Sequence, residues 1–137
     1  MELADTSAWT NRHKDPAVLR DFQDRLIRGQ IATCAMVRLE LLFSTRDAAE
    51  FRGRRDRLSA LREVPIGPSV WERATDVFEL LAAAGPLHHR RVKLPDLVIA
   101  ATAELAEIPL CHYDEDFETI AAVTGQPVRA IAALGSL

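Results

Sequence analysis

Hydrophobic residues along the chain fall into short continuous runs that alternate with stretches of helical spacing. The short runs predict strands over 1–4, 31–36, 109–113 and 127–134. Elsewhere apolar residues recur every three or four positions, which is typical of amphipathic helices. We expect helices from Asp15-Pro16 to Gly29, from a cap at Ser69 to Gly85-Pro86, and over 37–44, 47–64, 95–106 and 114–124. Short strands that alternate with helices favour an α/β fold with a small, mainly parallel sheet flanked by helices.

Composition narrows the class of protein. The 137 residues are 48% hydrophobic and 27% charged, which predicts a globular chain rather than a disordered one, and no linker or repeat divides it, so we expect a single domain over 1–137. The apolar stretches are too short to span a membrane, and the acidic Glu2 and Asp5 argue against a secretory signal, so we expect a cytoplasmic protein. Cys34 and Cys111 are expected to be buried, reduced thiols.

Charge location says more than net charge. The net charge of −3 argues against binding of nucleic acid through a broad basic face, but not against a nuclease with an acidic site. Acidic residues interrupt or directly follow apolar segments at five positions: Asp5, Glu40, Asp96, Asp114 and Asp116. No lysine or arginine lies within the apolar stretches around Asp5, Asp96 or Asp114. Because the carboxyl ends of parallel strands meet at one edge of a sheet, these acids are predicted to converge.

Each acid also has an ordinary interpretation. Asp96 and Asp114 are well placed as helix-terminal acids that satisfy free backbone N–H groups. Asp5 suits a turn, while Glu40 and Asp116 suit solvated helix positions. The argument for a site therefore depends on the five acids being considered together.

Converging carboxylates call for a cation. Like charges at about 4 Å repel by roughly 4 kcal/mol per pair at an effective dielectric constant of about 20. Oxygen-only ligation favours Mg²⁺ or Mn²⁺, and such a site hydrolyses phosphodiesters with metal-activated water. Thr6 and Ser7 follow Asp5 and are predicted either to orient it and a bound water or only to cap the turn.

Four blocks of sequence resemble the PIN-domain family, and most closely the VapC-type toxins of bacterial toxin–antitoxin pairs. The blocks are Leu3-Ala4-Asp5-Thr6-Ser7-Ala8-Trp9, Arg38-Leu39-Glu40-Leu41-Leu42, Leu94-Pro95-Asp96-Leu97-Val98-Ile99-Ala100-Ala101-Thr102-Ala103 and His112-Tyr113-Asp114-Glu115-Asp116-Phe117. The resemblance implies a three-layer α/β fold and a Mg²⁺-dependent endoribonuclease. It also implies homodimers and a VapB-like antitoxin that places a basic side chain in the acidic pocket.

The resemblance assigns roles to the acids residue by residue. It implies that Asp5 and Asp96 are the main metal ligands, that Glu40 and Asp114 complete the pocket, and that Asp116 is a fifth acid acting through water. Two features depart from the family pattern. The first strand is short and carries the small Ala4, which suggests a weakly held edge, and Glu115 lies between the two aspartates of the last block, which leaves the ligating acid open.

Basic residues beside Asp96 are candidates for RNA binding. Arg90, Arg91 and Lys93, together with His88 and His89, would hold phosphates that flank the scissile one; the alternative is a solvated loop. Arg52, Arg54, Arg55 and Arg57 share a predicted helix with acids, which favours a solvated face. Trp9 and Trp71 are expected to pack in the core or a dimer interface rather than stack on bases.

Two rival functions remain open. An aspartate-based phosphoryl-transfer domain would need an acidic neighbour close to its nucleophile and a lysine in a strand, and neither is present. A non-catalytic RNA- or protein-binding module would keep the fold without the chemistry. Such a module gains nothing from clustered, repelling carboxylates, which favours the nuclease.

Overall fold

The computed structural model describes residues 1–137, and five short strands form one sheet. The strands are β1 (Glu2–Ala4), β2 (Ile31–Thr33), β3 (Arg62–Glu63), β4 (Leu110–His112) and β5 (Val128–Ala130). They lie in the order β3-β2-β1-β4-β5, and every neighbouring pair is parallel. The predicted parallel sheet is therefore confirmed.

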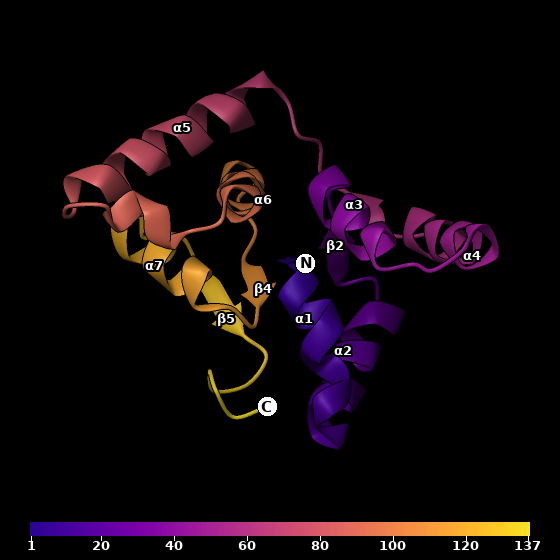
Figure 1. The fold of residues 1–137 in the computed structure, drawn as a ribbon. Helices are drawn as coiled ribbons and strands as arrows, with labels where there is room; N and C mark the ends of the chain where they lie inside the picture. Colours follow the sequence, from indigo (N-terminus) through magenta and orange to yellow (C-terminus); the bar gives the residue numbers. More distant parts are fainter.

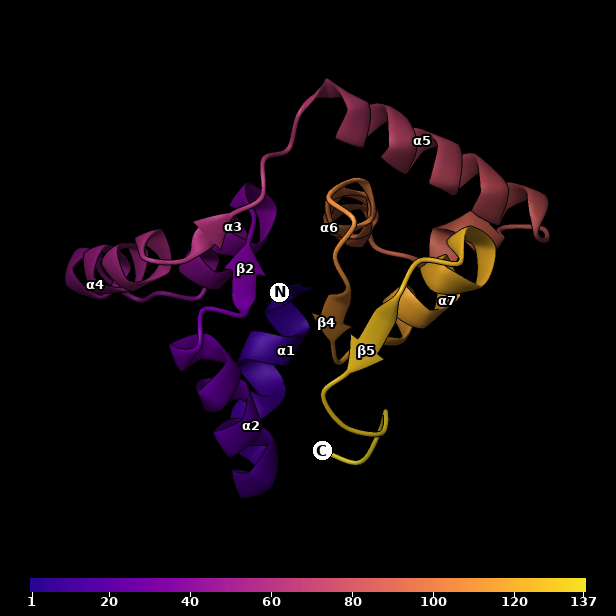
Figure 2. The same cartoon turned by 180° about the vertical axis from the view of Figure 1, so that it is seen from behind.

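Helices flank this sheet. They are α1 (Thr6–Asn11), α2 (Pro16–Ile27), α3 (Ala35–Phe43), α4 (Ala48–Ser59), α5 (Pro68–Ala83), α6 (Leu94–Leu105) and α7 (Glu115–Thr124), with short 3-10 helices η1 (Arg12–Lys14) and η2 (His88–Arg91). Figures 1 and 2 show α1 to α4 gathered in one half of the molecule and α5 to α7 in the other. The predicted α/β architecture is confirmed.

The strand order reverses direction between β1 and β4. After β1 the chain moves outward through β2 and β3, then returns to the other side of β1 to form β4. Ala4 pairs with Cys111, and the Asp5 N–H donates to the Cys111 carbonyl at 2.8 Å. In parallel sheets, ligands bind beyond the carboxyl ends of the strands at such a reversal of order. The fold thus brings the residues after β1 and after β4 to one place.

The hydrophobic core is continuous, which explains how a sheet of very short strands is stable. Twenty-seven buried apolar residues form a single cluster, and the residues of β1, β2 and β4 are all buried. Helix α6 is buried from Asp96 to Ala103, as its apolar sequence predicts. β1 pairs on both sides and its Leu3 and Ala4 are fully buried, so the expectation of a weakly held edge is wrong.

The predicted ends of two strands and one helix are wrong, because the apolar pattern along the sequence continues beyond the last residue of each element. The strand predicted over 31–36 ends at Thr33, since α3 begins at Ala35, and the strand predicted over 127–134 ends at Ala130. The helix predicted over 47–64 ends at Ser59, and Arg62–Glu63 form the exposed edge strand β3. Two exposed residues give no alternating pattern, so periodicity could not reveal this strand.

Other differences concern helix starts. Helix α5 begins at Pro68 after a Gly67 cap rather than at a Ser69 cap, because proline suits the first turn. The basic segment predicted as a loop over 88–93 contains η2. The sequence interpretation also missed α1, a short polar helix that Asp5 caps through the Ser7 N–H.

The structure shows the states of the two cysteines and the two tryptophans. Cys34 and Cys111 are buried and unpaired, as predicted. No helix combines the length and the apolar character that crossing a membrane requires. Of the two tryptophans, Trp9 is buried against Phe22, whereas Trp71 is about half exposed and does not belong to the core.

Candidate active site

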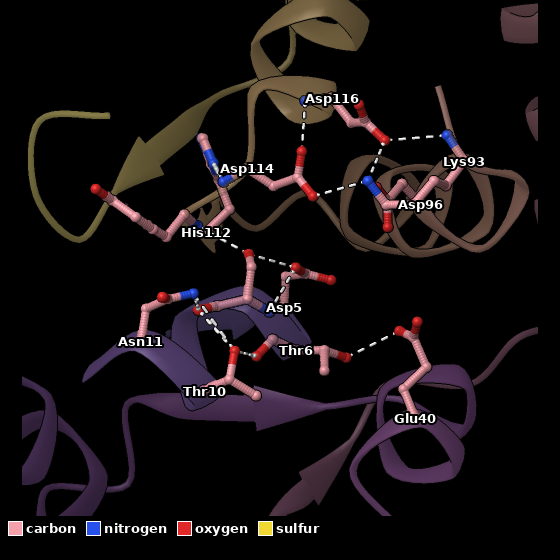
Figure 3. Close-up of polar contacts among 12 residues, drawn as sticks. Asp5, Thr6, Thr10, Asn11, Glu40, Lys93, Asp96, His112, Asp114 and Asp116 are labelled. Carbon is pink, nitrogen blue, oxygen red and sulfur yellow. Dashed lines mark hydrogen bonds and ion pairs between the residues drawn. The ribbon is translucent and has the colours of Figure 1, made fainter. Parts of the chain in front are cut away.

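The acids that the sequence analysis singled out come from both halves of the fold and face one region (Figure 3). Asp5 follows β1 directly, and Asp114 follows β4 after Tyr113. Asp96 and Asp116 lie in the first turns of α6 and α7, and Glu40 lies on α3. The predicted convergence thus occurs, although the five acids are not equally close to one another.

Three of them form a tight group, which we call the C-terminal acids: Asp96, Asp114 and Asp116. One carboxylate oxygen of each lies within 4.8 Å of the others. Asp96 is 4% exposed, and Asp114 also caps α7 by accepting from the Asp116 N–H at 2.9 Å. Asp114 therefore serves as a helix cap with one oxygen while its other oxygen faces the group.

A lysine contacts all three acids of this group and offsets part of their charge, contrary to the expectation that no basic residue would do so. Lys93 Nζ lies 2.9 Å from Asp114 Oδ2, 2.8 Å from Asp116 Oδ2 and 3.5 Å from Asp96 Oδ2. Burial lowers the pKa of Lys93, but hydrogen bonds to Asp116 and Asp114 outweigh that effect and raise it above its ordinary value. The ammonium that we expected beside RNA phosphates instead lies among the acids.

Asp5 is buried without a cationic partner. It is 3% exposed, and its Oδ2 accepts from the Ser7 N–H at 2.8 Å and the Ser7 hydroxyl at 2.5 Å. Its Oδ1 is buried and has no hydrogen-bond partner. Burial raises the pKa of Asp5 from 3.8 to about 6, which the bonds from Ser7 oppose and the charge of Glu40 reinforces. This carboxylate is thus oriented but not neutralised.

Glu40 lies beside Asp5 on the side away from the C-terminal acids (Figure 3). Its Oε1 accepts from the Thr6 hydroxyl at 2.8 Å, so helices α1 and α3 are joined at the site. Thr6 and Ser7 therefore hold two different acids. Neither Glu40 nor Asp5 belongs to the tight group of three, but the charge of Asp5 acts on Asp96.

The acids influence one another's protonation. Burial, a hydrogen bond to Asp116 and the charge of Asp5 raise the pKa of Asp96 well above its ordinary range. Burial also disfavours the Asp116 carboxylate, but hydrogen bonds with Asp96 and Lys93 outweigh it and lower the pKa of Asp116. Of these two acids, Asp96 is therefore the one whose neutral form is favoured, whereas Asp116 favours the carboxylate.

The donor set fits a divalent cation. Asp5 Oδ1 and Asp96 Oδ2 are buried carboxylate oxygens without a hydrogen-bond partner. Asp96 Oδ2 lies 3.5 Å from the Lys93 ammonium, but Asp5 Oδ1 has no cation beside it, an arrangement that is unfavourable unless something positive binds there. All ligands on offer are carboxylate oxygens, which suits Mg²⁺ or Mn²⁺ better than zinc.

Sequence analysis missed one residue that supports the site. His112 ends β4 and is fully buried; its Nδ1 accepts from the Asp114 N–H at 3.1 Å, and its Nε2 lies 3.1 Å from Glu118 Oε1. Burial lowers the pKa of His112, so the ring is neutral and holds the turn that carries Asp114. A lone histidine after a short apolar run offered no signal of this role.

The remaining candidates lie on the surface. Arg90 and Arg91 are exposed on η2 and form no ion pair, so their predicted role in RNA binding remains a prediction. Glu115 is exposed, while its neighbours Asp114 and Asp116 both bind Lys93. The side chains of the last block that face the other acids are thus Asp114 and Asp116.

Known proteins resemble this chain over almost its entire length. Ribonuclease VapC18 from Mycobacterium tuberculosis (strain ATCC 25618 / H37Rv) is 43% identical over 133 residues, which cover 97% of this chain and 96% of that protein. Ribonuclease VapC21 from M. tuberculosis (strain CDC 1551 / Oshkosh) is 43% identical over 138 residues, or 98% and 96% of the two chains.

Structural comparison gives the same fold. The VapBC-1 structure from nontypeable Haemophilus influenzae has a TM-score of 0.72 at 15% sequence identity and covers 95% of this chain and 97% of that one. The family model of the PIN domain matches residues 3–123. Since this match includes all five acids and the strands that position them, the chain belongs to the PIN-domain family.

Proposed function

We propose that this protein is a metal-dependent endoribonuclease and the toxin of a type II toxin–antitoxin pair. The observation that carries the proposal is Asp5 at the end of β1, which faces the C-terminal acids and whose buried Oδ1 has neither a hydrogen-bond partner nor a cation (Figure 3). Relatives at 43% identity are named ribonucleases, which supports the same activity here. Residues 1–137 would act as one PIN-like domain in the cytoplasm, where the RNA is.

The proposed metal is Mg²⁺, with Mn²⁺ as a substitute. Asp5, Asp96, Asp114 and Asp116 would hold it, since Asp5 supplies a buried oxygen without a partner and the other three acids each offer an oxygen within 4.8 Å of the others. When bound, such an ion lowers the pKa of water and neutralises charge on the phosphodiester.

The remaining residues of the site orient these groups. Ser7 fixes the direction of the Asp5 carboxylate, and His112 fixes the backbone that carries Asp114. Thr6 holds one oxygen of Glu40, whose other oxygen makes no hydrogen bond in the structure and is free to orient a water. Arg90 and Arg91 project from η2, two to three residues before Lys93, and would contact phosphates on either side of the cut.

The proposed partners are RNA, a VapB-like antitoxin and a second copy of the chain. Structural neighbours include toxin–antitoxin complexes such as VapBC-1, which supports an antitoxin partner. Phe43 on α3, which is 91% exposed, and Trp71 on α5 are apolar side chains that a partner could cover. The pocket already accommodates one ammonium group, so a basic antitoxin side chain would be compatible with it. Co-purification with the neighbouring gene product and light scattering of the isolated protein would test these assemblies.

One observation favours a second candidate, a non-catalytic RNA- or protein-binding module. Lys93 offsets the charge of the C-terminal acids, so part of this cluster is stable without a metal. A binding module could therefore retain these acids at little expense in stability. The unpartnered Asp5 Oδ1 has no such explanation and favours the nuclease.

Cleavage of a fluorogenic RNA with Mg²⁺ or with a chelator separates the two functions. Asp96→Asn should reduce cleavage on the order of 10³-fold, because several kcal/mol of charge stabilisation are lost. Glu115→Gln is the matched control, since Glu115 is exposed beside the site, and it should cleave like the parent. RNA binding without cleavage under any divalent ion would favour the binding module instead.

A further inference from the structure

Lys93 is the single cation among the acids of the site. The chain contains two lysines, Lys14 and Lys93, and Lys14 forms no ion pair. The Lys93 ammonium contacts all three C-terminal acids at 2.8 to 3.5 Å (Figure 3). A surface lysine ordinarily pairs with one carboxylate at most, so this arrangement needs an explanation.

The oxygens that Lys93 contacts belong to the carboxylates that would bind a divalent ion. The carboxylate groups of Asp96, Asp114 and Asp116 converge within 4.8 Å, and Lys93 lies against one oxygen of each. Mg²⁺ binds oxygens at about 2.0 to 2.1 Å, closer than an ammonium can. An ammonium and a divalent ion held together among these oxygens would repel each other, so the binding of one disfavours the binding of the other.

The structure allows the ammonium to leave without disturbing the fold. The Lys93 backbone N–H donates to Asp116 Oδ2 at 3.0 Å, so the main chain is anchored independently of the side chain. The side chain is 63% exposed although its end lies against the acids. A lysine is a flexible chain with a point charge at its end, which suits a group that moves between positions.

We propose that Lys93 is a built-in counter-ion that competes with the divalent cation for the C-terminal acids. Without metal, its ammonium limits the mutual repulsion of the acids and keeps the pocket assembled. Metal binding displaces the ammonium towards solvent. Lys93 therefore sets the metal concentration at which the site fills. This inference rests on the metal site proposed above.

The competition can be measured by titrating Mn²⁺ into the full-length protein in a calorimeter, without RNA. Lys93→Met should bind Mn²⁺ at least about tenfold more tightly, because no ammonium has to be displaced. Lys14→Met removes the other lysine, which is exposed and forms no ion pair, and its affinity should change less than about threefold. Equal affinities of the two variants would overturn the proposal.

A second measurement uses the parent protein and does not depend on how a variant folds. An amine-reactive reagent followed by mass spectrometry reports on Lys93, with Lys14 as the internal reference. Saturating Mn²⁺ should increase labelling of Lys93 relative to Lys14 several-fold, because an ammonium held by carboxylates is protected. Unchanged labelling at saturating Mn²⁺ would overturn the proposal.

The two inferences fail in different ways. If the parent and both variants bind no Mn²⁺, the metal site itself is wrong and the competition is overturned with it. If all three proteins bind Mn²⁺ with the same affinity, the metal site stands and only the role of Lys93 is wrong.

Discussion

The two sides of the acidic site are stabilised in different ways. On the N-terminal side, the hydroxyls of Thr6 and Ser7 donate to Glu40 and Asp5, and neither acid forms an ion pair. On the C-terminal side, an ammonium lies among three carboxylates. A neutral hydroxyl orients a carboxylate and leaves its charge in place, whereas an ammonium offsets that charge.

The difference shows which acid of the site lacks a positively charged partner. The C-terminal acids have a cationic partner in Lys93, but Asp5 Oδ1 has none, and the charge of Asp5 contributes to the raised pKa of Asp96. A divalent ion would offset the charge of Asp5 and of the C-terminal acids together. The Lys93 ammonium, which contacts only the C-terminal acids, cannot do this. Variants that alter one side should therefore have effects that differ in sign and size.

Of the variants considered, the largest effect on stability is expected from a change at Asp5, whose charge has no cationic partner. The rise in the pKa of Asp5 from 3.8 to about 6 corresponds to about 3 kcal/mol. Since the folded protein binds this proton more tightly, its contribution to stability is complete below pH 3.8 and is lost as the pH rises through about 6. In a chelator, Asp5→Asn should thus be more stable than the parent by up to about 3 kcal/mol at about pH 8 and similar to it near pH 4.

Urea unfolding at the two pH values measures this effect. Asp47→Asn is the matched control, because Asp47 caps α4 as Asp5 caps α1 but is exposed to solvent. Asp47→Asn should not reproduce the gain in stability that is expected of Asp5→Asn at about pH 8. A parent protein as stable in chelator at about pH 8 as Asp5→Asn would mean that the buried charge is compensated after all.

A smaller effect is expected from the hydroxyl that orients Asp5. Ser7 Oγ donates to Asp5 Oδ2 and accepts from the Tyr113 N–H at 2.8 Å, so it joins the ends of β1 and β4. Ser7→Ala should lower the free energy of unfolding by about 2 kcal/mol, since both partners lose a buried hydrogen bond. Cleavage should also fall, because the Asp5 carboxylate is no longer fixed.

Ser59→Ala provides the comparison for Ser7→Ala in the same unfolding assay. The Ser59 hydroxyl is exposed and bonds only to a carbonyl of its own helix. A loss of stability for Ser7→Ala no larger than that for Ser59→Ala would show that Ser7 does not link the two strands.

The sequence predicted much of this arrangement because strand ends and helix starts carry local signals. Asp5, Asp96 and Asp114 stand next to apolar runs, and the rule for parallel sheets was enough to expect their meeting. The α/β fold followed from the same alternation. Strand β3 did not, since a two-residue edge strand has neither length nor period.

The side-chain partners could not be predicted, because they depend on distances between elements. Lys93 precedes α6 in sequence and was assigned to RNA, yet its side chain reaches α7 and the end of β4. His112 and Glu118 are six residues apart, and their pairing depends on how α7 leaves β4. Periodicity predicts which face of an element is buried, not which polar atom meets it.

The smallest effect on stability is expected from a change at Glu118, which contacts His112 behind the C-terminal acids. Glu118 is half exposed and contacts the neutral His112 ring, whose Nδ1 accepts from the Asp114 N–H. Glutamine retains an oxygen that accepts from Nε2, so Glu118→Gln should lower the free energy of unfolding by less than about 1 kcal/mol. Urea unfolding measures it, with the exposed Glu115→Gln as the control. A loss above about 2 kcal/mol would mean that His112 and Glu118 form a charged pair, because only a charged ring would depend so strongly on the carboxylate. An imidazolium donates at both nitrogens and could not accept from the Asp114 N–H. The turn that carries Asp114 would then be held by a contact other than the bond to His112 Nδ1.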